Sequence, residues 1–259
     1  MNSKKIYSVI NQKGGVGKTT TTINLGTAMA ACGAKVLLID LDPQGNLSTG
    51  LGIEKADRNN GTYDILINKS SATKLYKETA VPNLHVITAN ENLLGLDIEL
   101  ANSSDRATRL RESLLEELNY DFILLDCPPA LNILTINALV ASEGALVPLQ
   151  AEFYALEGLS QLIKTINKIR NTINSKLKLE GIILTMYDAR NNLSNQVEED
   201  VRSYLGRDVF QTIIPRNIRL SEAPSHGVPA LIYDYKCLGS QAYINLAREV
   251  LIKAGWEIN

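Results

Sequence analysis

A glycine-rich segment near the start of the chain has the residue types that bind phosphate. It reads Asn11-Gln12-Lys13-Gly14-Gly15-Val16-Gly17-Lys18-Thr19-Thr20. Its second half matches the Gly-Lys-Thr of a phosphate-binding loop, in which backbone N–H groups hold phosphate oxygens and the lysine reaches the terminal phosphates. Gln12 stands where such a loop has its first glycine, and Lys13 is an additional lysine. Because three glycines remain, we expect the backbone to approach an anion closely.

The segments on either side of this loop are those that a phosphate site requires. Residues 5–11 predict a short buried strand, and residues 19–31 carry apolar side chains at helical spacing, with Gly33 as the helix end. In this order the helix presents its positive N-terminal end to a bound phosphate. We therefore predict a nucleotide-binding loop, in preference to a glycine-rich turn without a ligand.

Short apolar runs alternate with helical patterns along the rest of the chain. The runs are rich in Val, Ile and Leu without strict alternation, which is typical of parallel strands buried on both faces. We predict strands at residues 6–10, 35–39, 84–87, 122–125, 144–149, 181–185 and 209–214. The polar segment 52–82 is expected to be an insertion at one edge. Residues 1–259 thus predict a single α/β domain with a doubly wound, mostly parallel sheet flanked by helices.

Acidic residues follow two of the predicted strands, at the sheet edge where ligands bind in open parallel sheets. Asp40 and Asp42 are two residues apart in an extended segment, so both side chains could face the phosphates. Asp126 closes the strand at 122–125, as does the Walker-B acid that holds Mg²⁺ directly or through water. The alternative is that each acid only marks the end of a strand.

Composition limits the class of protein. The chain of 259 residues has a formal net charge of −2, two histidines and three scattered cysteines without metal-ligand or disulfide spacing. A reducing compartment is therefore expected. We expect no secretory leader, and no apolar run reaches the roughly 18 residues that a membrane helix needs. These features predict a cytoplasmic protein, and the net charge gives no indication of a nucleic-acid partner.

Together these motifs resemble the ParA/Soj family of DNA-partitioning ATPases, and chromosomal Soj-like proteins are the nearest match. The resemblance covers nearly the whole chain in order, through the glycine-rich loop and segments 40–46, 126–129, 154–159, 185–190 and 214–225. It implies a P-loop NTPase of the deviant Walker A type that uses ATP and Mg²⁺. The implied function is segregation of a chromosome or plasmid. An ATP-bound homodimer would bind DNA and be released on hydrolysis stimulated by a ParB-like centromere-binding protein.

The resemblance also implies a role for each residue of the site. Lys18 would contact the β- and γ-phosphates, Lys13 would reach the nucleotide of the partner subunit, and Asp42 would orient the attacking water. Three residues would organise the metal ion, which are Thr19, Asp40 and Asp126. The nucleotide would contact the loop residues Lys13, Gly14, Gly15, Val16, Gly17, Lys18, Thr19 and Thr20. Two later residues, Pro215 and Asn217, would lie beside the adenine.

For DNA, the resemblance implies non-specific binding to the duplex through Arg190, Arg219 and Lys236, and hence association with the nucleoid. Composition adds no support, because residues 187–259 contain eight Lys and Arg against nine Asp and Glu. A basic surface would have to be produced by folding and dimerisation. Leu238 also stands where relatives often carry a second basic residue, which leaves the strength of DNA binding open.

Three other classes of protein fit the sequence less well. A MinD-like membrane-positioning ATPase would need a basic amphipathic final helix, but the apolar stripe at residues 243–254 has mixed charges beside it and predicts a helix that packs on the core. A reductase like the nitrogenase iron protein would need cysteines that hold a cluster between subunits, which Cys32 and Cys127 do not match. A metabolic ligase or a tyrosine kinase is disfavoured, because Tyr233 and Tyr235 do not form a repeated tyrosine tail.

Overall fold

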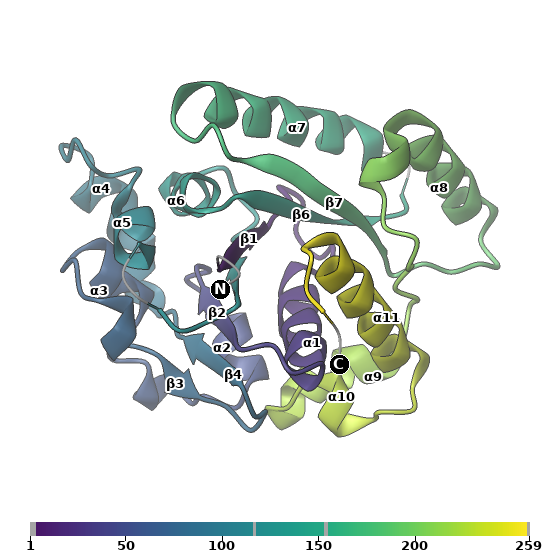
Figure 1. The fold of residues 1–259 in the computed structure, drawn as a ribbon, viewed down its shortest axis with the longest axis horizontal. Helices are drawn as coiled ribbons and strands as arrows, with labels where there is room; N and C mark the ends of the chain where they lie inside the picture. Colours follow the sequence, from purple (N-terminus) through teal and green to yellow (C-terminus); the bar gives the residue numbers. More distant parts are fainter. Residues whose placement is uncertain (1–3, 116–117, 153–154, 258–259) are drawn as a thin grey trace.

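A computed structural model describes residues 4–115, 118–152 and 155–257. Within these residues seven strands form one sheet in the order β3-β4-β2-β5-β1-β6-β7, and all neighbours are parallel except β3 and β4. The strands are β1 (Lys5–Val9), β2 (Val36–Asp40), β3 (Lys77–Glu78), β4 (Leu84–Ile87), β5 (Phe122–Asp126), β6 (Gly144–Gln150) and β7 (Lys178–Thr185). The predicted mostly parallel sheet is confirmed (Figure 1).

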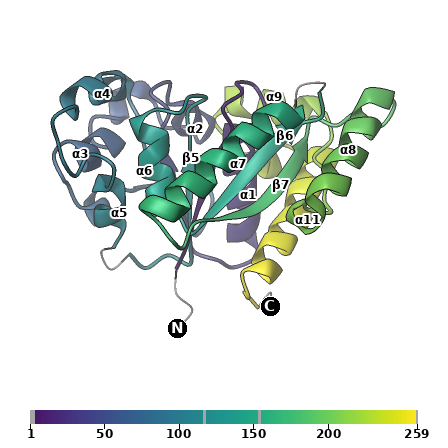
Figure 2. The ribbon, with the colours of Figure 1, turned by 90° about the horizontal axis from the view of Figure 1, so that it is seen from above.

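Helices cover both faces of this sheet. The α-helices are α1 (Lys18–Ala31), α2 (Asn46–Gly50), α3 (Thr62–Leu66), α4 (Leu96–Glu99), α5 (Arg109–Leu114), α6 (Ile133–Ala141), α7 (Ala155–Thr172), α8 (Asn192–Leu205), α9 (Ile218–Glu222), α10 (Ala230–Tyr233) and α11 (Leu238–Lys253). Short 3₁₀ turns lie between them, which are η1 (Lys55–Asp57), η2 (Ala72–Lys74), η3 (Glu91–Gly95), η4 (Gly206–Asp208) and η5 (Ala223–His226). Helix α7 crosses β6 and β7 on one face, while α1 and α11 pack together on the other (Figures 1 and 2).

The central strands β2 and β5 read as nearly continuous apolar runs because each faces two hydrophobic cores. In β2, Leu37 and Ile39 belong to the core beneath α5, α6 and α7, whereas Val36 and Leu38 belong to the core beneath α1 and α11. Successive side chains of a strand point to opposite faces, so a strand covered on both sides needs apolar residues at every position. Helix α1 approaches the sheet closely at Gly26, where an added Cβ would lie 2.7 Å from Leu38 Cδ2.

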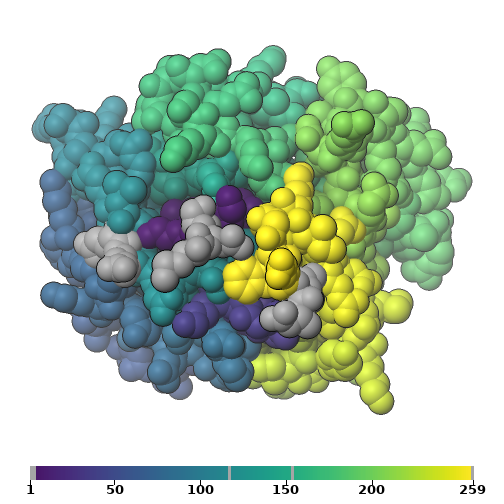
Figure 3. Space-filling view, viewed as in Figure 1, coloured from purple at the N-terminus to yellow at the C-terminus, as the bar shows by residue number. Residues whose placement is uncertain are grey.

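The final helix packs on the core, as its apolar stripe predicts. Tyr243, Leu246 and Val250 of α11 are buried, and the Tyr243 hydroxyl lies 3.1 Å from the Thr21 hydroxyl of α1. The C-terminal segment (yellow) lies on the face that also exposes the first part of the chain (purple, Figure 3). Since its apolar side is already covered by α1, α11 does not present that side to a membrane.

The prediction of a strand at residues 209–214 is wrong. The N–H groups of Gln211 and Thr212 donate to the Glu249 carboxylate, at 2.9 and 2.8 Å, and not to carbonyl groups of β7. The Glu249 side chain of α11 therefore interrupts the hydrogen-bond ladder. In the described part of the chain, this segment meets β7 through one isolated bridge, between Val209 and Ile182, and through N–H groups of Phe210 and Ile214 that donate to β7 carbonyls.

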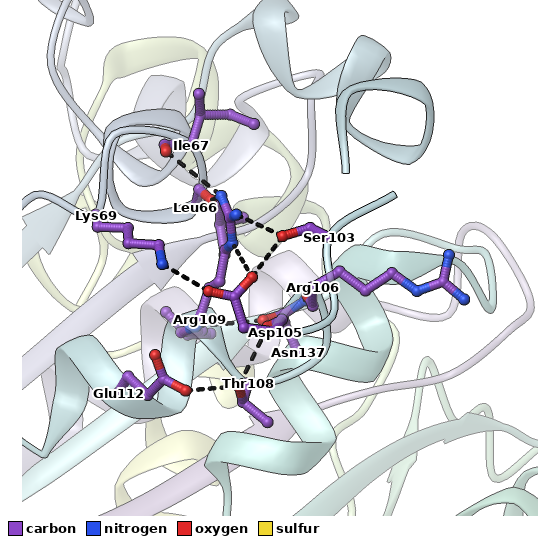
Figure 4. Close-up of polar contacts among 11 residues, drawn as sticks. Leu66, Ile67, Lys69, Ser103, Asp105, Arg106, Thr108, Arg109, Glu112 and Asn137 are labelled. Carbon is purple, nitrogen blue, oxygen red and sulfur yellow. Dashed lines mark hydrogen bonds and ion pairs between the residues drawn. The ribbon is translucent and has the colours of Figure 1, made fainter. Parts of the chain in front are cut away.

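The predicted insertion forms the edge of the sheet, and a cluster of charged groups attaches it. It contributes β3, which pairs with β4, and α3, whose Ile65 is buried. Asp105 accepts from Lys69 Nζ at 2.6 Å and from Arg109 Nε at 3.1 Å, and Arg109 Nη1 also donates to the Leu66 carbonyl at 2.6 Å (Figure 4). Hydrogen bonds led by that from Lys69 lower the pKa of Asp105. This cluster joins the end of α3 to the start of α5, although β3, β4 and α4 lie between them in the chain.

Candidate nucleotide-binding site

The glycine-rich loop connects β1 to α1 and has the conformation that an anion site requires. Gly15 and Gly17 have φ of 75° and 85°, in the left-handed region where glycine is favoured, and Gly17 is the N-cap of α1. The side chain of Lys18 is held inward, because the residue is only 7% exposed and its Nζ donates to the Lys13 carbonyl at 3.0 Å. Such a loop at a helix N-terminus favours bound phosphate.

A cavity of about 540 Å³ lies over this loop. Its lining combines most of the predicted phosphate and catalytic residues with several residues from later in the chain. The lining residues are Gly14, Gly15, Gly17, Lys18, Thr19, Thr20, Ile23, Asp42, Gln44, Asn46, Thr49, Pro129, Met186 and Pro224. Val16 has a different place. It is buried beneath the loop, and its carbonyl accepts a hydrogen bond from the Thr185 hydroxyl at 2.9 Å.

The end of β5 meets the first turn of α1 at Asp126. Its carboxylate accepts hydrogen bonds from the Thr19 and Thr22 hydroxyls at 2.8 and 3.0 Å. Burial raises the pKa of Asp126 to about 8, and the negative charge of Asp40 contributes to the shift. Burial also lowers the pKa of Lys18, an effect that Asp126 opposes. The fold thus brings together Thr19 and Asp126, two of the three residues expected to organise the metal ion.

Asp40 and Asp42 occupy different environments, although both were expected to face the phosphates. Asp42 is partly exposed and lines the cavity. Asp40 is fully buried and is not among the described residues that line it. Its Oδ2 accepts from the backbone N–H and hydroxyl of Ser48 at 3.0 and 2.7 Å, and burial raises its pKa to about 6. Asp42 therefore lies on the side of the phosphate loop, whereas Ser48 at the start of α2 binds the Asp40 carboxylate.

Lys13 lies outside the cavity. Its side chain is 51% exposed and forms an ion pair with Glu152, which is 43% exposed. It is not among the described residues that line the phosphate cavity, whereas Lys18 is. The two lysines of the loop therefore point to different places.

A second cavity of about 170 Å³ adjoins the first, and it contains both residues that were expected beside the adenine. Pro215 and Asn217 line it, and Gly17, Thr20 and Met186 line both cavities. Asn217 also caps α9 by accepting from the Arg219 N–H at 2.9 Å. A base could therefore occupy the smaller cavity while its phosphates reach the loop.

Comparisons with known proteins agree with this geometry. Residues 4–179 match a protein family that is described as an AAA domain. The chain is 53% identical over 254 residues to the chromosome partitioning protein ParA of Caulobacter vibrioides, with 96% of this chain and 95% of that protein covered. It is 51% identical over 247 residues to the sporulation initiation inhibitor protein Soj of Bacillus subtilis, with 95% and 98% covered.

The chain belongs to the ParA/Soj family of partitioning ATPases. The fold agrees with a solved structure, the cobyrinic acid a,c-diamide synthase of Mycobacterium smegmatis with a bound ATP analogue and magnesium. That structure matches with a TM-score of 0.86 and 33% identity, and 96% of this chain and 94% of that one are covered.

In this ParA/Soj family member, the three predicted DNA contacts lie in two places. Arg190 follows β7 and forms an ion pair with Asp188 at 2.9 Å. Arg219 of α9 pairs with Glu222 at 2.8 Å and lies 3.5 Å from Asp234. The backbone N–H of Lys236 donates to Asp234 Oδ1 at 3.1 Å, so Asp234 lies between Arg219 and Lys236. All three basic residues are exposed.

Sequence reasoning missed three residues of the site. Thr22 bonds to Asp126, Ser48 bonds to Asp40, and Met186 lines both cavities with a left-handed φ of 51°. Thr22 ends the run of threonines after Lys18, and Met186 directly follows β7, so both had a positional signal. Ser48 had none, because its role depends on how α2 turns back toward β2.

No helix in the described parts of the chain is long and apolar enough to cross a membrane.

Proposed function

We propose that this protein is an ATPase that segregates DNA by cycling between an ATP-bound dimer on DNA and a released form. The observation that carries the proposal is the position of Lys13. Its side chain is half exposed beside the phosphate loop and forms a surface ion pair with Glu152. Exposed ion pairs contribute about 0–1 kcal/mol, so Lys13 can exchange this partner for the nucleotide phosphates of a second subunit at little cost.

ATP and Mg²⁺ fit the donors of the cavity. Lys18, the loop N–H groups and the N-terminus of α1 provide positive charge for the phosphates. The Thr19 hydroxyl, bonded to the Asp126 carboxylate, provides hard oxygen ligands. Mg²⁺ in phosphate sites is held by few protein ligands, together with phosphate oxygens and water. Thr19 and Asp126 would hold the ion, and it would neutralise phosphate charge.

The residues at the cavity divide the chemistry between them. Asp42, the partly exposed acid of the cavity, would orient the attacking water. Lys18 would stabilise the terminal phosphates within its own subunit. Lys13 of the second subunit would add positive charge where negative charge develops during phosphoryl transfer, as an arginine finger does. Hydrolysis therefore requires the dimer, and release of phosphate removes the group that both lysines share.

Dimerisation would also create the DNA-binding surface. Each subunit contributes a small set of basic residues, and two weak sets on one rigid body act as one bivalent site. Arg190, Arg219 and Lys236 would contact phosphates without reading sequence. They would have to exchange acidic partners such as Asp188 for DNA phosphates. A ParB-like partner that accelerates hydrolysis would release dimers from the DNA near it. Away from this partner, the dimers would stay bound to DNA and hence associated with the nucleoid.

A DNA-binding titration tests this cycle. Affinity for a duplex of arbitrary sequence is measured at two salt concentrations, first with ATP and then with ADP, with Lys13→Ala as the control. We expect binding only with ATP, a decrease in affinity as salt rises, and no binding by Lys13→Ala. Equal binding with both nucleotides, or binding that does not change with salt, would exclude the proposed cycle.

A further inference from the structure

Arg58 is a buried arginine next to the segment that carries Asp42. It follows η1, is only 4% exposed, and donates to three acceptors. Its Nη1 bonds to the Gly45 carbonyl at 3.1 Å, its Nη2 to the Thr49 hydroxyl at 2.9 Å, and its Nε to the Ile53 carbonyl at 3.1 Å. Two of these acceptors lie between the Asp42 turn and the end of α2, and the third follows shortly after it.

The Gly45 carbonyl links Arg58 directly to the turn that begins at Asp42. The Asp42 carbonyl accepts from the Gly45 N–H at 2.8 Å, and Asp42 Oδ1 accepts from the Gln44 N–H at 3.0 Å. The Gly45 carbonyl in turn accepts from the N–H and hydroxyl of Thr49, at 2.9 and 3.0 Å. The guanidinium thus binds the point at which the turn passes into α2.

The turn has open space on both sides, so packing alone does not fix it. One side faces the phosphate cavity, and the other faces a cavity of about 260 Å³ lined by residues that include Pro43, Gln44 and Arg58. Gln44 lines both cavities. Between them, the arginine is closely fitted to Gly45, which has φ of 64° and where an added Cβ would lie 2.5 Å from Arg58 Nη1.

We propose that Arg58 is a positioning residue for ATP hydrolysis, which holds the Asp42 turn at the distance from the nucleotide that the attacking water needs. The inference rests on the proposed function, in which Asp42 orients that water. Arginine suits this role because its planar guanidinium presents several donors in fixed directions, and a lysine cannot reach three acceptors in the same way. A displacement of about 1 Å in such a group can reduce a rate on the order of 100-fold.

The experiment compares Arg58→Met and Arg58→Lys with Arg106→Met as the matched control. Arg106 is an arginine whose side chain points away from the Asp105 cluster (Figure 4). For each full-length variant we measure the affinity for a fluorescent ATP analogue, the rate of hydrolysis per bound ATP at saturating ATP, and the melting temperature. We expect Arg58→Met to bind the analogue within about threefold of wild type and to hydrolyse ATP about 10- to 100-fold more slowly. Arg58→Lys should be intermediate, and Arg106→Met should match wild type.

A double variant separates a positioning role from a structural one. If Arg58 acts through Asp42, Arg58→Met should slow hydrolysis no further in an Asp42→Ala background. A purely structural role would instead lower the melting temperature and the affinity for the analogue, while the rate per bound ATP stayed at the wild-type value, and this result would overturn the inference. If Arg58→Met does not fold, Arg58→Lys and Thr49→Val provide the same comparison.

The outcomes also distinguish this inference from the proposed function. If Asp42→Ala hydrolyses ATP at the wild-type rate, the role proposed for Asp42 fails, and that of Arg58 fails with it. If Asp42→Ala is slow and Arg58→Met is as fast as wild type, the proposed function stands and only the inference about Arg58 is overturned.

Discussion

Lys13 forms an ion pair with Glu152 of the same subunit, beside a cavity in which Lys18 is buried. Two lysines five residues apart in one loop therefore have opposite environments. Lys18 is held inward by the Lys13 carbonyl, and Lys13 extends outward. We propose that the outward lysine acts on the nucleotide of another subunit and that the inward one acts on its own nucleotide.

Substitution of each lysine should separate these two functions. Lys18→Ala should weaken nucleotide binding by at least about 100-fold, because a charged donor is removed from a largely buried phosphate site. Lys13→Ala should bind a fluorescent ATP analogue normally but neither dimerise nor hydrolyse ATP. The measurements are an analogue titration and sedimentation of each variant with ATP. Loss of analogue binding in both variants, or dimers in both, would contradict the separation.

Asp126→Asn should stabilise the nucleotide-free protein and abolish its response to Mg²⁺. The pKa of Asp126 is raised to about 8, so the folded state favours the protonated acid. Stability from this group is therefore fully present below the unfolded pKa of about 4 and is lost as pH rises through the folded pKa.

The check is a series of melting temperatures from about pH 5 to about pH 9 without nucleotide. We expect wild type to lose stability as pH rises, and Asp126→Asn to lose less and to melt a few degrees higher at about pH 8. With ATP present, added Mg²⁺ should raise the melting temperature of wild type only. A variant with the same pH profile as wild type would show that Asp126 is not the group that titrates.

Removal of the basic residues should weaken DNA binding without affecting dimerisation. Arg190→Ala, Arg219→Ala and Lys236→Ala should each lower affinity for any DNA sequence, and the slope of log affinity against log salt should decrease by about 1 for each phosphate that the variant no longer neutralises. Arg106→Ala is the control. Titrations at several salt concentrations, with the oligomeric state measured in parallel, provide the check. An unchanged slope would show that the substituted residue does not bind phosphate.

Neutralising an acidic partner should have the opposite effect. The Arg190 side chain bonds to both oxygens of Asp188, and these bonds lower the pKa of Asp188 to about 2, so Asp188 is charged throughout the physiological range. Asp188→Asn should therefore free Arg190 and raise DNA affinity. The exposed pair contributes little to stability, so the melting temperature should not change by more than about 2 °C. Weaker DNA binding in this variant would indicate that Asp188 positions Arg190 for the phosphate.

The sequence predicted those parts of the fold that depend on local pattern. Residues 35–39 and 122–125 read as buried strands because apolar side chains occupy both faces, and the loop at Lys18 read as a phosphate site because glycine, lysine and threonine are adjacent. The failures came from contacts between distant residues. Glu249, which lies on α11, accepts hydrogen bonds from the segment predicted to be the last strand. Ser48 donates to the Asp40 carboxylate, which does not line the phosphate cavity in the described structure.

The same limit applies to the site itself. Lys13 was identified as unusual from its position, but its pairing with a residue 139 positions later could not be read from spacing. Arg58 was not identified either, because its role depends on the folded turn and on the space to either side of it.

The most direct test of the account is the mass of Asp42→Ala in solution by light scattering, with saturating ATP and Mg²⁺ and then with ADP. Asp42→Ala should hydrolyse ATP slowly. Each bound ATP therefore keeps its γ-phosphate, which Lys13 of the opposite subunit would contact. We predict a dimer with ATP, a monomer with ADP, and a monomer under both conditions when Lys13→Ala is added to the variant. A monomeric Asp42→Ala protein at saturating ATP would contradict the central claim that Lys13 acts across a nucleotide-dependent dimer.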